Sequence, residues 1–140
     1  MQLADTSAWA WSRRPGLQDL RSEFDALVED REIATCDMVR LELLYSAQNE
    51  AEFRELAADL QALVDCPIGE PVWKRALWVY GELARGGGAH QRAVKHPDLL
   101  IAAAAEAAEV TVLHYDEDFE RIASITGQGH RWLARPGSLS

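Results

Sequence analysis

The sequence predicts an α/β fold, in which helices cover both faces of a mostly parallel sheet. Short apolar segments rich in β-branched residues alternate with longer segments whose apolar residues recur at helical spacing. The chain has 140 residues, of which 48% are hydrophobic and 26% charged. That length and composition are typical of one globular domain with its own core, which we expect to span residues 1–140.

The first half of the chain begins with a short apolar segment, MQLAD, which is typical of a buried strand that ends at Asp5. Farther along, Asp37 is a suitable N-cap for the helix that follows the β-branched segment EIATC. The elements expected in this half are, in order, strand 1–5, helix 17–30, strand 32–36, helix 38–47 and helix 50–64.

The second half contains the clearest strand, VTVLHY, which is apolar and β-branched. A Trp-rich amphipathic segment before it predicts a helix that stops at Gly86, Gly87 and Gly88. The elements expected here are helix 71–85, helix 98–108, strand 110–115, a short helix over 116–125 and strand 129–134. Because residues 37–85 read as helices alone, the sequence leaves the order of the strands open.

Several acidic residues are expected at the edge of the sheet where parallel strands end and helices begin. Asp5 ends the first strand, Asp116 follows VTVLHY, and Asp118 lies two residues beyond. Glu42 lies in the helix after the second strand, within two turns of the same edge. Three separate segments therefore bring carboxylates toward one place.

Asp98 stands in front of a run of seven apolar residues, which is typical of a helix buried nearly all round. Such a helix is a costly place for a carboxylate. The helix 98–108 is about 16 Å long, the strand 110–115 about 20 Å, and only Glu109 separates them. The two elements must therefore run antiparallel, which brings Asp98 beside Asp116.

A pocket that gathers Asp5, Glu42, Asp98 and Asp116 crowds like charges, which raise one another's pKa. Protons could neutralise them, but a hard divalent cation suits oxygen ligands better near pH 7. We therefore predict a metal site. Taken singly, each residue has a simpler alternative: a turn for Asp5, a surface position for Glu42, and helix-end roles for Asp98, Asp116 and Asp118.

Five segments, in this order, resemble the PIN-domain family, and most closely the VapC-type toxins of bacterial toxin–antitoxin pairs. They are LADTSAW (3–9), RLELL (40–44), HPDLLIAAAA (96–105), VLHYDEDFERIA (112–123) and WLARPGSL (132–139). The resemblance implies a three-layer α/β/α sandwich. It also implies an endoribonuclease that depends on Mg²⁺ or Mn²⁺, is inhibited by a cognate antitoxin and often forms a homodimer.

By the same resemblance, the catalytic residues are Asp5, Glu42, Asp98 and Asp116. The metal ligands it implies are Asp5, Asp98, Asp116 and Asp118, with Asp118 as an alternative or auxiliary ligand. Thr6 matches a small hydroxyl residue that supports the first aspartate. The implied reaction leaves 5′-phosphate and 3′-hydroxyl ends, and the number of metal ions stays open.

The net charge of −9 excludes attraction of RNA by bulk charge, so binding needs local basic patches or bridging cations. Two clusters are candidates for contact with the RNA backbone: Arg13 and Arg14, and Arg85, Arg92 and Lys95. The two cysteines lack metal-ligand spacing and are expected to be buried thiols in a reducing compartment. Without a signal peptide or an apolar run of about 20 residues, we expect a cytoplasmic protein with no membrane contact.

Two other functions remain as alternatives. One is Mg²⁺-dependent phosphoryl transfer or phosphatase activity, but the first strand lacks an Asp-x-Asp motif, and the only lysines are Lys74 and Lys95. The other is a PIN-like interaction module without catalysis, which the complete acidic set disfavours.

Overall fold

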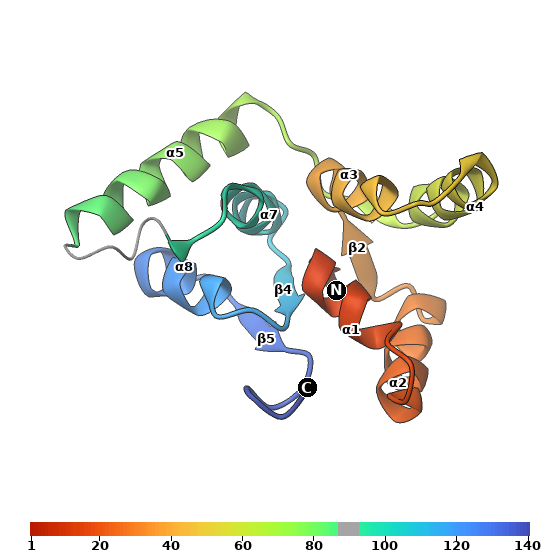
Figure 1. Ribbon diagram of the computed structural model, residues 1–140. Coiled ribbons are helices and arrows are strands. Elements are labelled where there is room, and N and C mark those ends of the chain that lie inside the picture. The colour runs from red at the N-terminus through yellow and green to blue at the C-terminus, as the bar shows by residue number, and fades with distance from the viewer. Residues whose placement is uncertain (87–92) are drawn as a thin grey trace.

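The chain, described by a computed structural model at residues 1–86 and 93–140, has a central five-stranded sheet (Figure 1). The strands are β1 (Gln2–Ala4), β2 (Ile33–Thr35), β3 (Val64–Asp65), β4 (Thr111–His114) and β5 (His130–Trp132). The helices in these ranges are α1 (Thr6–Ser12), α2 (Gln18–Glu29), α3 (Asp37–Tyr45), α4 (Glu50–Gln61), α5 (Glu70–Arg85), α7 (His96–Ala107) and α8 (Asp118–Thr126).

The strands lie in the order β3-β2-β1-β4-β5, and every neighbouring pair is parallel. The chain runs from β1 outward to β3 and then returns to the other side of β1 for β4. The direction of winding therefore reverses between β1 and β4. Open α/β sheets bind ligands at such a switch point, beyond the carboxyl ends of the strands.

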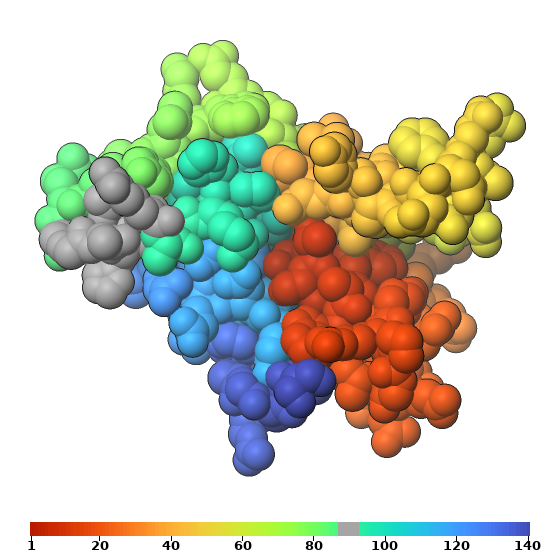
Figure 2. Space-filling model, viewed as in Figure 1, coloured from red at the N-terminus to blue at the C-terminus, as the bar shows by residue number. Residues whose placement is uncertain are grey.

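Helices cover both faces of this sheet, with α1 and α2 on one side and α7 on the other (Figure 1). Helices α5 and α8 pack against α7. Figure 2 shows α1 side by side with α3, which it contacts although the two are far apart in the sequence. The α/β class and the covering of both faces are as predicted.

Helix α7 forms the centre of the core on its side of the sheet. All eight residues from Asp98 to Ala105 are buried, as the apolar run predicts. The turn after the helix passes through Glu109, which has a φ of 59°, and leads directly into β4. The helix therefore returns antiparallel to the strand, and its first turn lies at the edge where β4 ends.

Two elements were missed by the sequence reasoning. Helix α1 has only seven residues, and its Ala-Trp-Ala-Trp stretch alternates with a period of two instead of 3.6. Strand β3 has two exposed residues and gives no apolar signal, so residues 50–64 read as one continuous helix. Helix α3 begins at Asp37 itself, with Cys36 at the N-cap position, so the predicted cap is wrong by one residue.

The remaining elements lie where the sequence predicts them, within a few residues at their ends. Helix α5 ends at Arg85 with Gly86 as its C-cap, whereas Gly87 and Gly88 fall outside the described residues. Cys36 and Cys66 are free and buried, as expected. A search of the described ranges for a helix long and apolar enough to cross a membrane finds none.

Candidate metal centre

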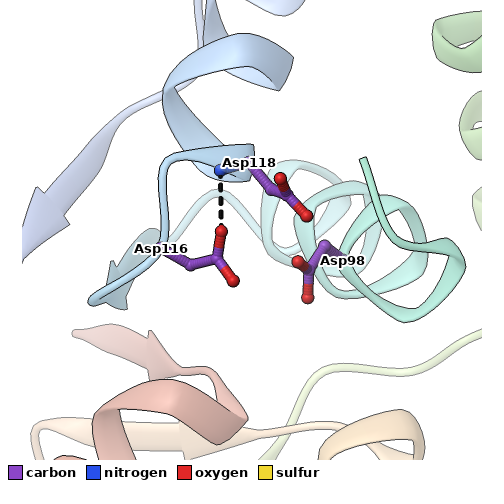
Figure 3. A group of neighbouring side chains, drawn as sticks. All are labelled: Asp98, Asp116 and Asp118. Carbon is purple, nitrogen blue, oxygen red and sulfur yellow. Dashed lines mark hydrogen bonds between the residues drawn. The ribbon is translucent and has the colours of Figure 1, made fainter. Parts of the chain in front are cut away.

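Three carboxylates meet beyond the end of β4, and Figure 3 shows them directed toward one another. Asp98 comes from the first turn of α7, Asp116 from the turn after β4, and Asp118 from the start of α8. One oxygen from each residue lies within 4.8 Å of the other two. The juxtaposition of Asp98 and Asp116 that the sequence predicts is therefore present, and Asp118 completes the group.

A lysine ammonium lies among these three carboxylates. Lys95 Nζ is 2.7 Å from Asp116 Oδ2, 2.8 Å from Asp118 Oδ2 and 3.4 Å from Asp98 Oδ2. The backbone N–H of Lys95 also donates to Asp118 Oδ2 at 3.0 Å. Partial burial lowers the pKa of Lys95, but its hydrogen bonds to Asp116 and Asp118 have a larger opposite effect. The pKa is therefore raised above its usual value, and the ammonium stays charged. The carboxylates are thus arranged around a positive charge.

Asp98 is the least satisfied member of the group. Asp98 is only 5% exposed, and its Oδ2 is buried without a hydrogen-bond partner among the described residues. Burial, and then the neighbouring carboxyl of Asp118, raise the pKa of Asp98. A buried carboxylate oxygen directed toward two further carboxylates is suited to ligating a hard divalent cation. The donor set therefore fits such an ion.

Asp118 has the opposite environment. Burial alone would raise the pKa of its carboxyl, but hydrogen bonding with Asp98 and Lys95 holds it below the usual value. Arg121 contributes a further contact, Nη1 to Oδ1 at 3.2 Å. Asp116 Oδ1 accepts the backbone N–H of Asp118 at 2.9 Å, which makes the turn compact (Figure 3). Asp118 is therefore held as an anion, whereas Asp116 is partly exposed.

Asp5 lies at the end of β1, as predicted, and is also the N-cap of α1. Its Oδ1 accepts the Ala8 N–H at 3.0 Å and the Ser7 hydroxyl at 2.7 Å. Burial raises the pKa of Asp5 to about 6, against the effect of those hydrogen bonds, and the charge of Asp116 adds to the rise. Asp5 is thus near enough to interact electrostatically with the three carboxylates but is not one of that group.

The hydroxyl that supports Asp5 is Ser7, whereas the sequence reasoning gave this role to Thr6. Ser7 Oγ also accepts the backbone N–H of Tyr115 at 2.8 Å, so it joins the ends of β1 and β4. The Thr6 hydroxyl instead donates to Glu42 Oε1 at 2.7 Å. Both hydroxyls sit next to Asp5 in the sequence, and nothing in that spacing distinguishes their roles.

Glu42 is not a member of the group of three carboxylates. Together with Thr6 it lines a groove of about 980 Å³ formed by residues of α1 to α4 and the segments that join them. Of the predicted acidic set, the structure thus gathers Asp98, Asp116 and Asp118 and places Asp5 nearby. Glu42 is held on the α1 side of the site by its hydrogen bond with Thr6.

A family model for the PIN domain matches residues 3–125. The chain belongs to the PIN-domain family. This PIN domain is 43% identical to Ribonuclease VapC18 of Mycobacterium tuberculosis (strain ATCC 25618 / H37Rv), over 96% of each chain. It is 40% identical to Ribonuclease VapC21 of Mycobacterium tuberculosis (strain ATCC 25618 / H37Rv), over 97% of this chain and 96% of that one. The resemblance to VapC-type proteins is therefore confirmed.

Solved structures share the fold of this PIN domain. VapBC from Salmonella typhimurium bound to DNA matches with a TM-score of 0.69 at 19% identity, over 96% of this chain and all of that chain. A toxin–antitoxin complex from Klebsiella pneumoniae matches with a TM-score of 0.68 at 18% identity, over 96% and 98% of the two chains. The predicted PIN-type α/β/α architecture is confirmed.

The predicted basic clusters of the PIN domain have different surroundings. Arg13 pairs with Asp25 at 2.8 Å, and Arg85 pairs with Glu82 on its own helix. The Arg14 guanidinium lies over the ring of Trp11, 4.4 Å from its centroid. Within the described residues it forms no ion pair. Arg92 falls outside the described residues. Lys95, which is also predicted to contact RNA, lies within the acidic site.

The affinity of this PIN domain for Mn²⁺ is expected to rise between about pH 5 and about pH 8. The raised pKa of Asp98, and that of Asp5 at about 6, mean that protons occupy the site at low pH and must leave when a cation binds. Each released proton strengthens binding by up to about tenfold per pH unit. Calorimetry in buffers of different ionisation enthalpy measures that release, and a flat affinity without proton release would contradict the prediction.

Proposed function

We propose that this PIN domain is a divalent-metal-dependent endoribonuclease of the VapC type, the toxin of a toxin–antitoxin pair. The observation that carries the proposal is the group of Asp98, Asp116 and Asp118 around the Lys95 ammonium at the switch point of the sheet. It is supported by two relatives named Ribonuclease VapC, which are 43% and 40% identical. Phosphoryl transfer on a small substrate and a non-catalytic module have no such support.

The cation we propose is Mg²⁺ or Mn²⁺, held by Asp98, Asp116 and Asp118. Such an ion, when bound, lowers the pKa of a water and neutralises charge on the scissile phosphate. Asp5, with a pKa of about 6, is suited to accept a proton from the attacking water close to neutral pH. Its hydrogen bonds from Ser7 and Ala8 fix the direction of its carboxylate.

Lys95 and Arg14 are the basic residues best placed to contact the RNA backbone. With a cation held by the carboxylates, the Lys95 ammonium would be free to contact RNA at the edge of the site, where its side chain is 59% exposed. Arg14 covers Trp11, whose ring meets that of Tyr115 edge-on at 5.3 Å, and Tyr115 adjoins Asp116. A path of positive charge and aromatic surface thus leads to the carboxylates, which suits single-stranded RNA.

We propose that the cognate antitoxin binds the groove that Thr6 and Glu42 help to line. Most of the lining residues are apolar, and the Glu42 carboxylate suits an arginine of the partner. We expect the complex to weaken when the arginines of the antitoxin's binding segment are changed to glutamine, and equal affinity would contradict this assignment.

We also propose that the protein forms a homodimer in the cytoplasm. Helix α5 exposes Trp73, Leu77 and Trp78, and a second apolar hollow of about 520 Å³ lies between it and the start of α7. Such a patch is typical of a protein interface. We expect Leu77→Asp to convert a dimer to a monomer in sedimentation experiments, and an unchanged mass would contradict this interface. The two free, buried thiols fit a reducing compartment.

The proposed activity predicts that purified protein, free of antitoxin, cleaves bacterial RNA with Mg²⁺ but not with EDTA. Discrete fragments with 5′-phosphate ends are expected, and Asp98→Asn should reduce their formation by about 100-fold or more. Asp19→Asn, on the exposed first turn of α2, is the matched control and should cleave like the wild type. Intact RNA from a protein that still binds Mn²⁺ would contradict the ribonuclease assignment.

A further inference from the structure

Two histidines lie directly behind the acidic turn. His114 is the last residue of β4 and is 0% exposed, and His130 is the first residue of the neighbouring strand β5. Their rings stack with centroids 5.1 Å apart, and His114 Nε2 lies 2.9 Å from His130 Nδ1. Phe119 and Trp132 pack on the ring of His114 at 5.0 and 4.8 Å. The ring of His114 therefore has little freedom to turn.

The hydrogen bonds determine where the protons of this pair lie. The backbone N–H of Asp116 donates to His114 Nδ1 at 3.1 Å, so this nitrogen is an acceptor and carries no proton. A neutral imidazole then has its proton on Nε2, which donates to His130 Nδ1.

The Asp116 amide that His114 holds belongs to the turn that carries two of the three carboxylates. Asp116 Oδ1 in turn accepts the backbone N–H of Asp118. A chain of hydrogen bonds thus runs from β5, through the ring at the end of β4, into the acidic turn. The bond to the Asp116 amide needs this tautomer, because a His114 ring with its proton on Nδ1 would oppose that amide with a second donor.

We propose that His114 and His130 are positioning residues of the metal centre: His130 sets the tautomer of His114, and His114 orients the Asp116–Asp118 turn for cation binding. The inference rests on the proposed metal-dependent function. Residues that orient metal ligands in this way commonly change metal affinity by about 10- to 100-fold when they are replaced.

Two substitutions of His130 separate hydrogen bonding from packing. His130→Asn retains an acceptor close to the place of Nδ1, whereas His130→Phe retains the ring and removes the acceptor. The first readout is the ¹⁵N chemical shifts of His114 in metal-free, histidine-labelled protein, which identify the tautomer. The second is Mn²⁺ affinity by calorimetry, and the third is kcat against KM for RNA cleavage.

We expect the Nε2-protonated form of His114 in the wild type and in His130→Asn, and its loss in His130→Phe. Mn²⁺ affinity should fall about tenfold in His130→Phe alone, with a loss in kcat larger than any change in KM. A wild type with the proton on Nδ1 would overturn the proposal, and so would equal losses in the two variants. Because the tautomer is measured without metal, failure of wild-type Mn²⁺ binding would overturn the proposed function separately.

Discussion

Replacing Lys95 by methionine is expected to tighten Mn²⁺ binding by about tenfold, which corresponds to about 1.4 kcal/mol. In the metal-free protein the Lys95 ammonium contacts all three carboxylates, so a cation must first displace it. Methionine keeps most of the unbranched side chain and removes the charge. Substitutions near a metal site usually weaken binding, so an increase in affinity is a distinctive result.

Calorimetric titration with Mn²⁺ measures this effect, and Lys74→Met is the matched control because Lys74 pairs with Glu70 on an exposed part of α5, away from the three carboxylates. The same Lys95→Met variant should melt at a lower temperature in EDTA, because three carboxylates then lack their positive partner. Mn²⁺ should restore the melting temperature. Weaker Mn²⁺ binding in Lys95→Met would show that Lys95 supports the cation instead of competing with it.

Asp98→Asn is expected to abolish RNA cleavage and at the same time to stabilise the metal-free protein, by about 1 to 2 kcal/mol at pH 8. Asp98 Oδ2 is buried without a hydrogen-bond partner. Because its folded pKa is raised, the stability that protonated Asp98 provides is complete below its unfolded pKa and is lost as the pH rises toward the folded value. Asparagine cannot ionise, so the Asp98→Asn protein does not lose this stability as the pH rises.

Asp118→Asn is the informative comparison, because the pKa of Asp118 is lowered and its anion accepts hydrogen bonds from Lys95 and Arg121. This substitution should destabilise the metal-free protein at the same pH, although it alters the same group of carboxylates. Denaturant unfolding in EDTA measures both changes. Equal shifts of the same sign would contradict the different environments of the two residues.

The neighbourhood of Asp98 and Asp116 could be predicted because the helix and the strand that follows it are joined by a turn short enough to leave only an antiparallel arrangement. The α/β class could be predicted from the alternation of strand-like and helix-like apolar patterns. The order of the strands could not be derived, because β3 has two exposed residues and leaves no apolar pattern. Without β3, the chain between β2 and α5 reads as helices alone.

The role of Lys95 was missed for a different reason. A lysine in a connecting segment reads as surface charge, and only the folded structure shows that its ammonium reaches carboxylates from two elements. Ser7 and Thr6 illustrate the same limit, since adjacent hydroxyls at the start of a helix point in different directions. Such contacts depend on how helices are rotated, which local sequence patterns leave open.

Anomalous diffraction from crystals of the antitoxin-free protein grown with Mn²⁺ tests the central claim most directly. We expect a peak between the carboxylates of Asp98, Asp116 and Asp118, with the Lys95 ammonium moved away from them. Loss of the peak in Asp98→Asn, but not in Asp19→Asn, would complete the assignment. Lys95 still seated among the carboxylates, with no peak there at millimolar Mn²⁺, would contradict a metal centre at this place and the mechanism built on it.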